Sequence, residues 1–68
     1  MVKTIYFIRG DNEFREVIID KDYDYFRINW RKRHPLEELT AYISGMIAKG
    51  WRKATLIEYI KNKYRRNN

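Results

Sequence analysis

Three segments in the first half of the chain hold short runs of apolar residues without a breaker, which is typical of β-strands, and the third of them alternates apolar and polar residues. They cover residues 2–9, 13–20 and 24–31 and are rich in Ile, Val, Phe and Tyr. The connections at 10–12 and 20–24 are short and carry Asp with Gly or Asn, which favour tight turns. Because parallel strands need long crossover connections, these short turns predict a three-stranded antiparallel meander.

The second half of the chain changes to the period of a helix. One predicted stripe contains Leu36, Leu39, Ile43, Met46 and Ile47. Pro35 suits the first helical position and Gly50 suits the stop, so the pattern predicts a helix over 35–49. Gly45 lies inside this helix, where glycine costs about 1 kcal/mol relative to alanine. We therefore expect a neighbouring element to approach the helix closely at Gly45.

A second helix is predicted over 54–65. Thr55 and Glu58 have the spacing of a capping box, and a second apolar stripe follows at Ile57, Ile60 and Tyr64. The predicted order is therefore βββαα, an α+β fold in one small domain that spans residues 1–68. We expect both helices to pack on the same face of the sheet.

The period of two also assigns side chains to the two faces of the sheet. The predicted core face holds Ile5, Phe7, Val17, Ile19, Phe26, Ile28 and Trp30. The opposite face is apolar at Tyr6, Ile8, Phe14 and Ile18. If the helices leave that second face uncovered, these four residues form a partner surface, which predicts a homodimer or another protein partner.

Charge is distributed unevenly along the chain, whose net charge is +6. Residues 1–25 hold four basic and six acidic side chains, and residues 26–68 hold eleven basic and three acidic ones, so the second part carries +8. A strongly basic part in so small a domain attracts polyanions. Solubility is the alternative explanation, since many small proteins are basic without a polyanionic partner.

The basic residues form clusters in "FRINWRKRHP", "KGWRKA" and "KNKYRR", with Tyr25, Trp51 and Tyr64 nearby. Guanidinium groups contact phosphates and aromatic rings stack on bases, so the clusters predict nucleic-acid binding, with DNA favoured over RNA. The predicted contacts are Arg27, Arg31, Lys32, Arg33, Arg52, Lys53, Lys61, Lys63, Arg65 and Arg66. Each cluster also has a structural explanation: Glu16 can pair with Arg27, and cations complement helix C-termini.

Catalytic and metal-binding patterns are weak in this sequence. Cysteine is absent, His34 is the one histidine, and the three glycines lie far apart, so we expect no enzyme activity, no metal and no cofactor. The aspartates of "DKDYD" resemble the opening of a calcium loop, but Tyr25 and Arg31 occupy the positions that require Gly and Glu. An aspartate-capped turn is the favoured interpretation.

The same features predict a cytoplasmic protein, because thiols, a signal-peptide pattern and long apolar runs are all missing. Two functions from different classes remain. The first is a small basic nucleic-acid-binding protein, regulatory in role, that contacts phosphates through its basic loops and third strand. The alternative is a protein-interaction or inhibitor module, encoded by a mobile element, that uses the outer face of its sheet.

Overall fold

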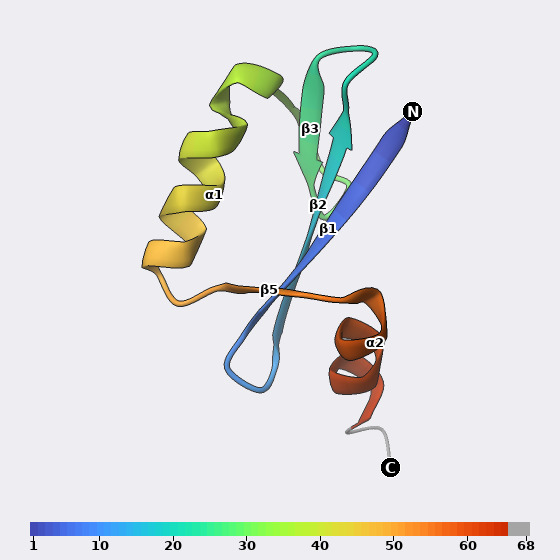
Figure 1. The fold of residues 1–68 in the computed structure, drawn as a ribbon, viewed down its shortest axis with the longest axis vertical. Coiled ribbons are helices and arrows are strands. Elements are labelled where there is room, and N and C mark those ends of the chain that lie inside the picture. The colour runs from blue at the N-terminus through green and yellow to red at the C-terminus, as the bar shows by residue number, and fades with distance from the viewer. Residues whose placement is uncertain (66–68) are drawn as a thin grey trace.

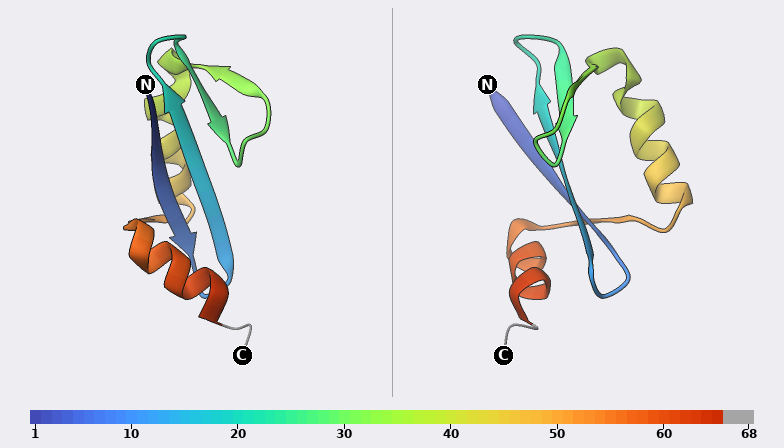
Figure 2. Two further views of the ribbon diagram at one scale, coloured as in Figure 1. Left: turned by 90° about the vertical axis from the view of Figure 1, so that its right-hand side faces the viewer. Right: turned by 180° about the vertical axis from the view of Figure 1, so that it is seen from behind.

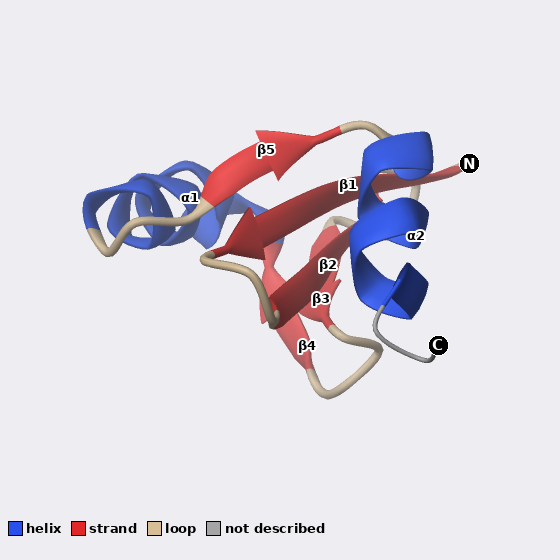
Figure 3. Cartoon of the chain, turned by 90° about the horizontal axis from the view of Figure 1, so that it is seen from below, coloured by secondary structure: helices blue, strands red, loops and turns tan. Residues whose placement is uncertain are grey.

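One antiparallel sheet organises the protein, whose computed structural model describes residues 1–65. The sheet has five strands in the order β4-β3-β2-β1-β5; Figure 1 shows the fold, and Figure 3 labels all of the strands, β4 included. The elements in chain order are β1 (Val2–Arg9), β2 (Glu13–Asp20), β3 (Tyr25–Ile28), β4 (Arg33–Pro35), the 3-10 helix η1 (Leu36–Glu38), α1 (Leu39–Ala48), β5 (Arg52–Ala54) and α2 (Leu56–Tyr64). The α+β class and the antiparallel pairing agree with the sequence prediction. The prediction of three strands is too low by the two short strands β4 and β5.

The two helices lie on opposite sides of the sheet (Figure 3). Helix α1 covers the face that carries Phe7 and Phe26, and the ring of Tyr59 in α2 packs on the other face against Tyr6 and Phe14. The expectation that both helices share one face is therefore wrong. No helix in residues 1–65 is long and apolar enough to cross a membrane.

The main core lies between α1 and the sheet. Its buried members are Phe7, Val17, Ile19, Phe26, Met46 and Trp51, and Ile5, Ile28, Leu36, Leu39, Tyr42 and Ile43 pack against them. The period of two therefore identified this face correctly along β1, β2 and β3. On the first helical stripe, Ile47 is the exception, because it points into solvent.

Trp30 lies outside the core, contrary to the prediction. Strand β3 ends at Ile28, and the next two residues, Asn29 and Trp30, have left-handed backbone angles with φ of 51° and 61°. The amide of Arg31 donates to the carbonyl of Ile28 at 3.0 Å, which closes a tight turn. Left-handed angles at both central residues are typical of the hairpin turn of type I′. Because the chain leaves the strand before residue 30, the alternation no longer applies and Trp30 is 60% exposed.

The C-terminal end of α1 and the N-terminal end of α2 lie at the capping residues that the sequence predicts. Gly50, with φ of 95°, donates to the carbonyl of Ile47, and Trp51 donates to that of Met46, which together form a Schellman motif. The hydroxyl of Thr55 accepts from the amide of Glu58 at 3.1 Å and caps α2 as predicted. Pro35 differs from its predicted place, because it ends β4 and η1 precedes α1.

Two other local expectations have clear outcomes. The side chain of Asp20 accepts from the amides of Asp22 and Tyr23, so the aspartates form the capped turn that was favoured. Gly45 has no neighbouring heavy atom within 4 Å of the place where a Cβ would lie. The predicted close approach at Gly45 is therefore wrong.

Candidate nucleic-acid interface

The β3–β4 hairpin is a strongly basic part of the surface. Residues 25–36 contain no Asp or Glu, and they contain Arg27, Arg31, Lys32, Arg33 and His34. Arg31, Lys32 and Arg33 are exposed in and after the turn. Because β4 is an edge strand, the hairpin forms one border of the sheet, drawn in green in Figure 2.

A tyrosine ring orders two of these cations. Arg27 and Arg33 are cross-strand partners, and their guanidinium carbons lie 5.6 Å and 4.3 Å from the ring centre of Tyr25. Arg27 also donates to the carbonyl of Arg31 at 3.2 Å, so its side chain stabilises the turn that follows β3. The predicted Glu16–Arg27 pair is not formed, because Arg27 lies opposite Ile18 in the sheet.

Two hydrogen bonds fasten the turn to strand β2. The amide of Asn29 donates to the carbonyl of Glu16 at 2.9 Å, and the amide of Glu16 donates to Asn29 Oδ1 at 2.8 Å. The side chain of Asn29 thus supplies the acceptor that a backbone carbonyl supplies in a regular ladder. Asparagine tolerates the left-handed conformation better than most residues, so it suits both tasks. The turn of residues 28–31, which we call the tip turn, is therefore held in place.

The first of two grooves beside the tip turn lies on the side of α1. This α1-side groove has a volume of about 560 Å³ and is lined by Arg15, Ile28, Asn29, Arg31, Lys32, His34 and Tyr42. Arg15 donates to the hydroxyl of Tyr42 at 3.1 Å, and the ring of His34 stacks on Phe26 at 5.1 Å. No carboxylate lines the groove within residues 1–65, so its electrostatic character suits an anion such as a phosphate.

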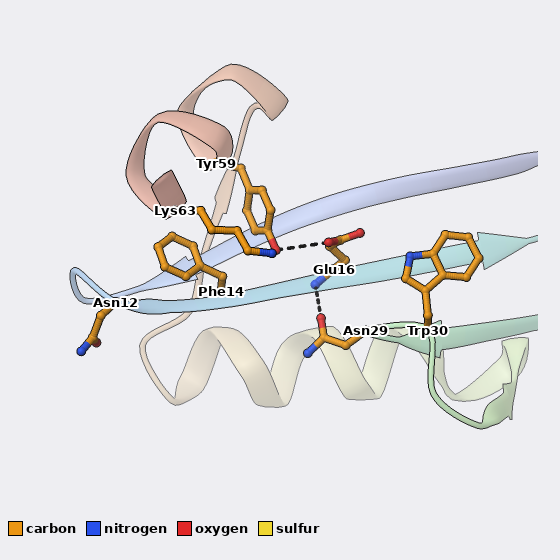
Figure 4. Close-up of a pocket in the computed structure, with 7 residues that line it drawn as sticks. All are labelled: Asn12, Phe14, Glu16, Asn29, Trp30, Tyr59 and Lys63. Atoms are coloured by element: carbon orange, nitrogen blue, oxygen red, sulfur yellow. Dashed lines mark hydrogen bonds between the residues drawn. The ribbon is translucent and has the colours of Figure 1, made fainter. Parts of the chain in front are cut away.

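The second groove lies on the side of α2 and has a volume of about 460 Å³. Its lining consists of Asn12, Phe14, Glu16, Asn29, Trp30, Tyr59 and Lys63. Figure 4 shows Lys63, Tyr59 and Phe14 on one side and Trp30 on the other, with Glu16 and Asn29 between them. This α2-side groove therefore combines aromatic rings with a carboxylate, an amide and an amine.

Tyr59 fixes the position of the carboxylate in the α2-side groove. Its hydroxyl donates to Glu16 Oε2 at 3.3 Å, while its ring meets Phe14 edge-on at 5.6 Å. Burial first, and then the Glu16 carboxylate, raise the pKa of Tyr59 to about 12. The phenol therefore remains a protonated donor at neutral pH. The amine of Lys63 lies 5.3 Å from the centre of the same ring.

The predicted basic residues do not gather on one surface. Arg27, Arg31, Lys32 and Arg33 share the hairpin, and Lys63 reaches the α2-side groove. Arg52 and Lys53 lie on β5 at the opposite edge, which is four strand spacings or about 19 Å away. Arg52 also forms an ion pair with Glu58 at 2.7 Å. Lys61 is exposed on α2, Arg65 ends that helix, and Arg66 lies outside the described residues.

The predicted partner surface on the sheet is covered. Ile8 and Ile18 are buried, and Tyr59 of α2 packs on Tyr6 and Phe14. Helix α2 has the reverse of its predicted orientation, because its exposed apolar side chains are Leu56, Ile57, Ile60 and Tyr64. The premise of an open sheet face is therefore wrong, and the exposed apolar surface belongs to α2 instead.

The sequence prediction left several residues that line the two grooves out of the binding site, among them Arg15, Glu16, Asn29 and Trp30. One of them carried a usable signal, because Asn before a basic run is a typical turn residue. The alternation of "FRINW" concealed this signal by extending the strand through Trp30. Arg15 and Glu16 had no local signal, since their partners Tyr42 and Tyr59 lie far along the chain.

In comparisons with known proteins, no family model, curated protein or solved structure matches this chain.

Proposed function

We propose that the protein binds nucleic acid through the β3–β4 hairpin and the two grooves beside its tip turn. The observation that carries this proposal is the exposed run Arg31, Lys32 and Arg33 on a hairpin edge that contains no acidic residue. Phosphate groups are the polyanionic ligand that such a run suits best, because guanidinium groups contact them with two parallel hydrogen bonds.

The arrangement supports binding to the backbone more than recognition of a base sequence. The cations of the hairpin lie on a short edge strand and a turn. They do not lie on a helix that could enter a major groove. Contacts of this kind fix the protein on the nucleic acid without reading its sequence. The affinity is therefore expected to be similar for unrelated sequences.

Fluorescence anisotropy with labelled DNA and RNA at low salt tests the proposal. The double variant Arg31→Glu/Lys32→Glu is expected to weaken binding to every sequence tested. The matched control is Lys3→Glu/Lys21→Glu, which changes two exposed lysines elsewhere and lowers the net charge equally, from +6 to +2. Equal losses in the two variants would indicate an effect of net charge alone, and absence of binding by the wild type would reject the function.

The exposed side of α2 favours a second function, self-association. Ile57 is 69% exposed, and Leu56, Ile60 and Tyr64 are exposed beside it, whereas Tyr59 is the buried residue of this helix. We infer that a second copy of the chain covers this face. A domain of 68 residues has a limited core, and two α2 helices related by a two-fold axis would each bury the same stripe.

Sedimentation velocity over a range of protein concentrations tests self-association. The wild type is expected to form dimers as the concentration rises, and Ile57→Glu is expected to remain a monomer because it places a charge in the apolar stripe. The control Lys21→Glu introduces the same residue at an exposed position of the β2–β3 turn, at the opposite end of the molecule from α2 (Figure 1). A wild type that remains a monomer at every concentration would contradict this second function.

A further inference from the structure

We propose that the α2-side groove receives one unpaired nucleobase, which stacks on Trp30, so that the protein prefers single-stranded to double-stranded nucleic acid. This inference rests on the proposed function and assigns the form of nucleic acid that the hairpin binds. Three observations support it: the unusual backbone of Trp30, the chemistry of the α2-side groove, and the position of the α1-side groove across the tip turn.

Trp30 occupies a conformation that a bulky side chain rarely adopts. Its φ of 61° is typical of glycine at this position of a tight hairpin turn, yet its indole is 60% exposed. Among the ring–ring and cation–ring contacts of residues 1–64, none involves this indole. Strained residues of this kind concentrate at functional sites, where the surrounding structure holds them in place. Here the two bonds between Asn29 and Glu16 hold the turn.

The polar groups of the groove suit a base rather than a phosphate. The Glu16 carboxylate repels phosphate, but it accepts hydrogen bonds from the amino and imino groups on the edge of a base. Asn29 offers an amide whose oxygen is already engaged by the amide of Glu16, so its Nδ2 remains as a donor toward base acceptors. The volume of about 460 Å³ falls within the range of about 300–1,000 Å³ that is usual for small-molecule sites.

The α1-side groove supplies the complementary place for phosphates. Both grooves are lined by Asn29, so a strand that crosses the tip turn meets cations on one side and Trp30 on the other. Lys63 lies at the far wall of the α2-side groove, where it can neutralise the next phosphate (Figure 4). A base in a duplex is stacked and paired, so it enters such a site only after it leaves the helix, which costs a few kcal/mol.

Anisotropy measurements with one labelled sequence, as a single strand and as a duplex, test the inference. The wild type is expected to bind the single strand more tightly. Trp30→Gly is expected to lose roughly 5- to 150-fold in affinity for the single strand, the range that corresponds to one stacked base, and to lose less for the duplex, whose bases remain stacked on one another. Trp30→Phe retains a ring and is expected to keep most of the preference. Tyr23→Ser, at an exposed tyrosine in the distant β2–β3 turn, is the control and is expected to match the wild type.

Tryptophan fluorescence gives an independent signal. Stacking on Trp30 is expected to quench part of the wild-type emission, whereas in Trp30→Phe the buried Trp51 alone emits and is expected to show no quenching. Equal affinity for both forms of nucleic acid, together with no effect of Trp30→Gly, would overturn the inference and leave the proposed function intact. Absence of binding to either form would overturn both.

Discussion

Replacement of Trp30 by glycine and by alanine tests the left-handed tip turn directly. The two variants lose nearly the same side chain, so their difference reports the backbone. A residue with a Cβ in the left-handed region costs about 1–2 kcal/mol that glycine avoids, and Trp30 has φ of 61°. In a regular strand the order is opposite, because glycine is less stable than alanine by about 0.5–1 kcal/mol. We therefore expect Trp30→Gly to be more stable than Trp30→Ala by about 1 kcal/mol.

The absolute losses follow from the exposure of the indole. Trp30 keeps 60% of its surface in solvent, so the covered remainder of a side chain that buries 150–250 Å² amounts to roughly 60–100 Å². At about 25 cal/mol per Å², its loss costs about 1.5–2.5 kcal/mol in both variants. Relief of the backbone strain in Trp30→Gly offsets about half of this loss. A fully buried Trp30 would instead cost about 3–5 kcal/mol.

Urea denaturation followed by far-ultraviolet circular dichroism measures the free energies of unfolding, with the slope against urea compared among variants. Tyr23→Gly and Tyr23→Ala provide the control pair, because Tyr23 is an exposed aromatic residue in a turn without a positive φ. At position 23 alanine is expected to be at least as stable as glycine. An alanine variant at position 30 that equals or exceeds the glycine variant would refute the left-handed tip turn.

Three further predictions concern the rest of the fold. Phe26→Ala is expected to cost about 3–5 kcal/mol of unfolding free energy, because Phe26 is buried at the centre of the core; a loss below about 1 kcal/mol in urea denaturation would contradict that core. Gly45→Ala is expected to raise stability by about 1 kcal/mol, since the helix gains propensity and the new methyl group meets open space, and a lower melting temperature would show a hidden contact. Tyr59 gives a pH dependence: because its pKa is raised to about 12, its contribution is complete below the unfolded value near pH 10 and is lost as the pH rises toward 12. The difference in stability between the wild type and Tyr59→Phe should therefore shrink above about pH 10, and a constant difference would argue against the Tyr59–Glu16 contact.

The long strands could be predicted because each is rich in β-branched and aromatic residues and lacks a breaker over eight residues. Strands β4 and β5 have three residues each, which is too few for a pattern to emerge from composition alone. They form because β3 and β1 present open edges, and an edge is a property of the assembled sheet. Their positions therefore depend on tertiary structure that local sequence does not encode.

The orientation of α2 shows how a distant contact overrides a local stripe. Ile57, Ile60 and Tyr64 predict an inward face, but Tyr59 turns toward the sheet, where its ring packs on Tyr6 and its hydroxyl reaches Glu16. Tyr59 and Glu16 are 43 residues apart in sequence. No periodicity within the helix could reveal that partner, so the predicted face was wrong although the helix itself was correct.

The candidate site was predictable in its charge and not in its geometry. The basic run after Phe26 follows from the sequence, but the two grooves depend on where the chain turns. The turn at Asn29 and Trp30 ends the strand at Ile28, three residues before the predicted end at residue 31, which moves Trp30 from the core to the surface. Lys53, at the other edge of the sheet, was grouped with the hairpin only because sequence does not order the strands.

The salt dependence of binding tests the central claim most directly, because it counts the phosphates that the hairpin neutralises. For a single strand, the slope of log affinity against log salt changes by about 0.7 unit for each lost contact. Arg31→Gln/Lys32→Gln is expected to reduce the slope by about twice that amount, whereas the control Lys3→Gln/Lys21→Gln should leave it unchanged. The same slope in the wild type and in the hairpin variant would show that these side chains contact no phosphate, which would contradict the account.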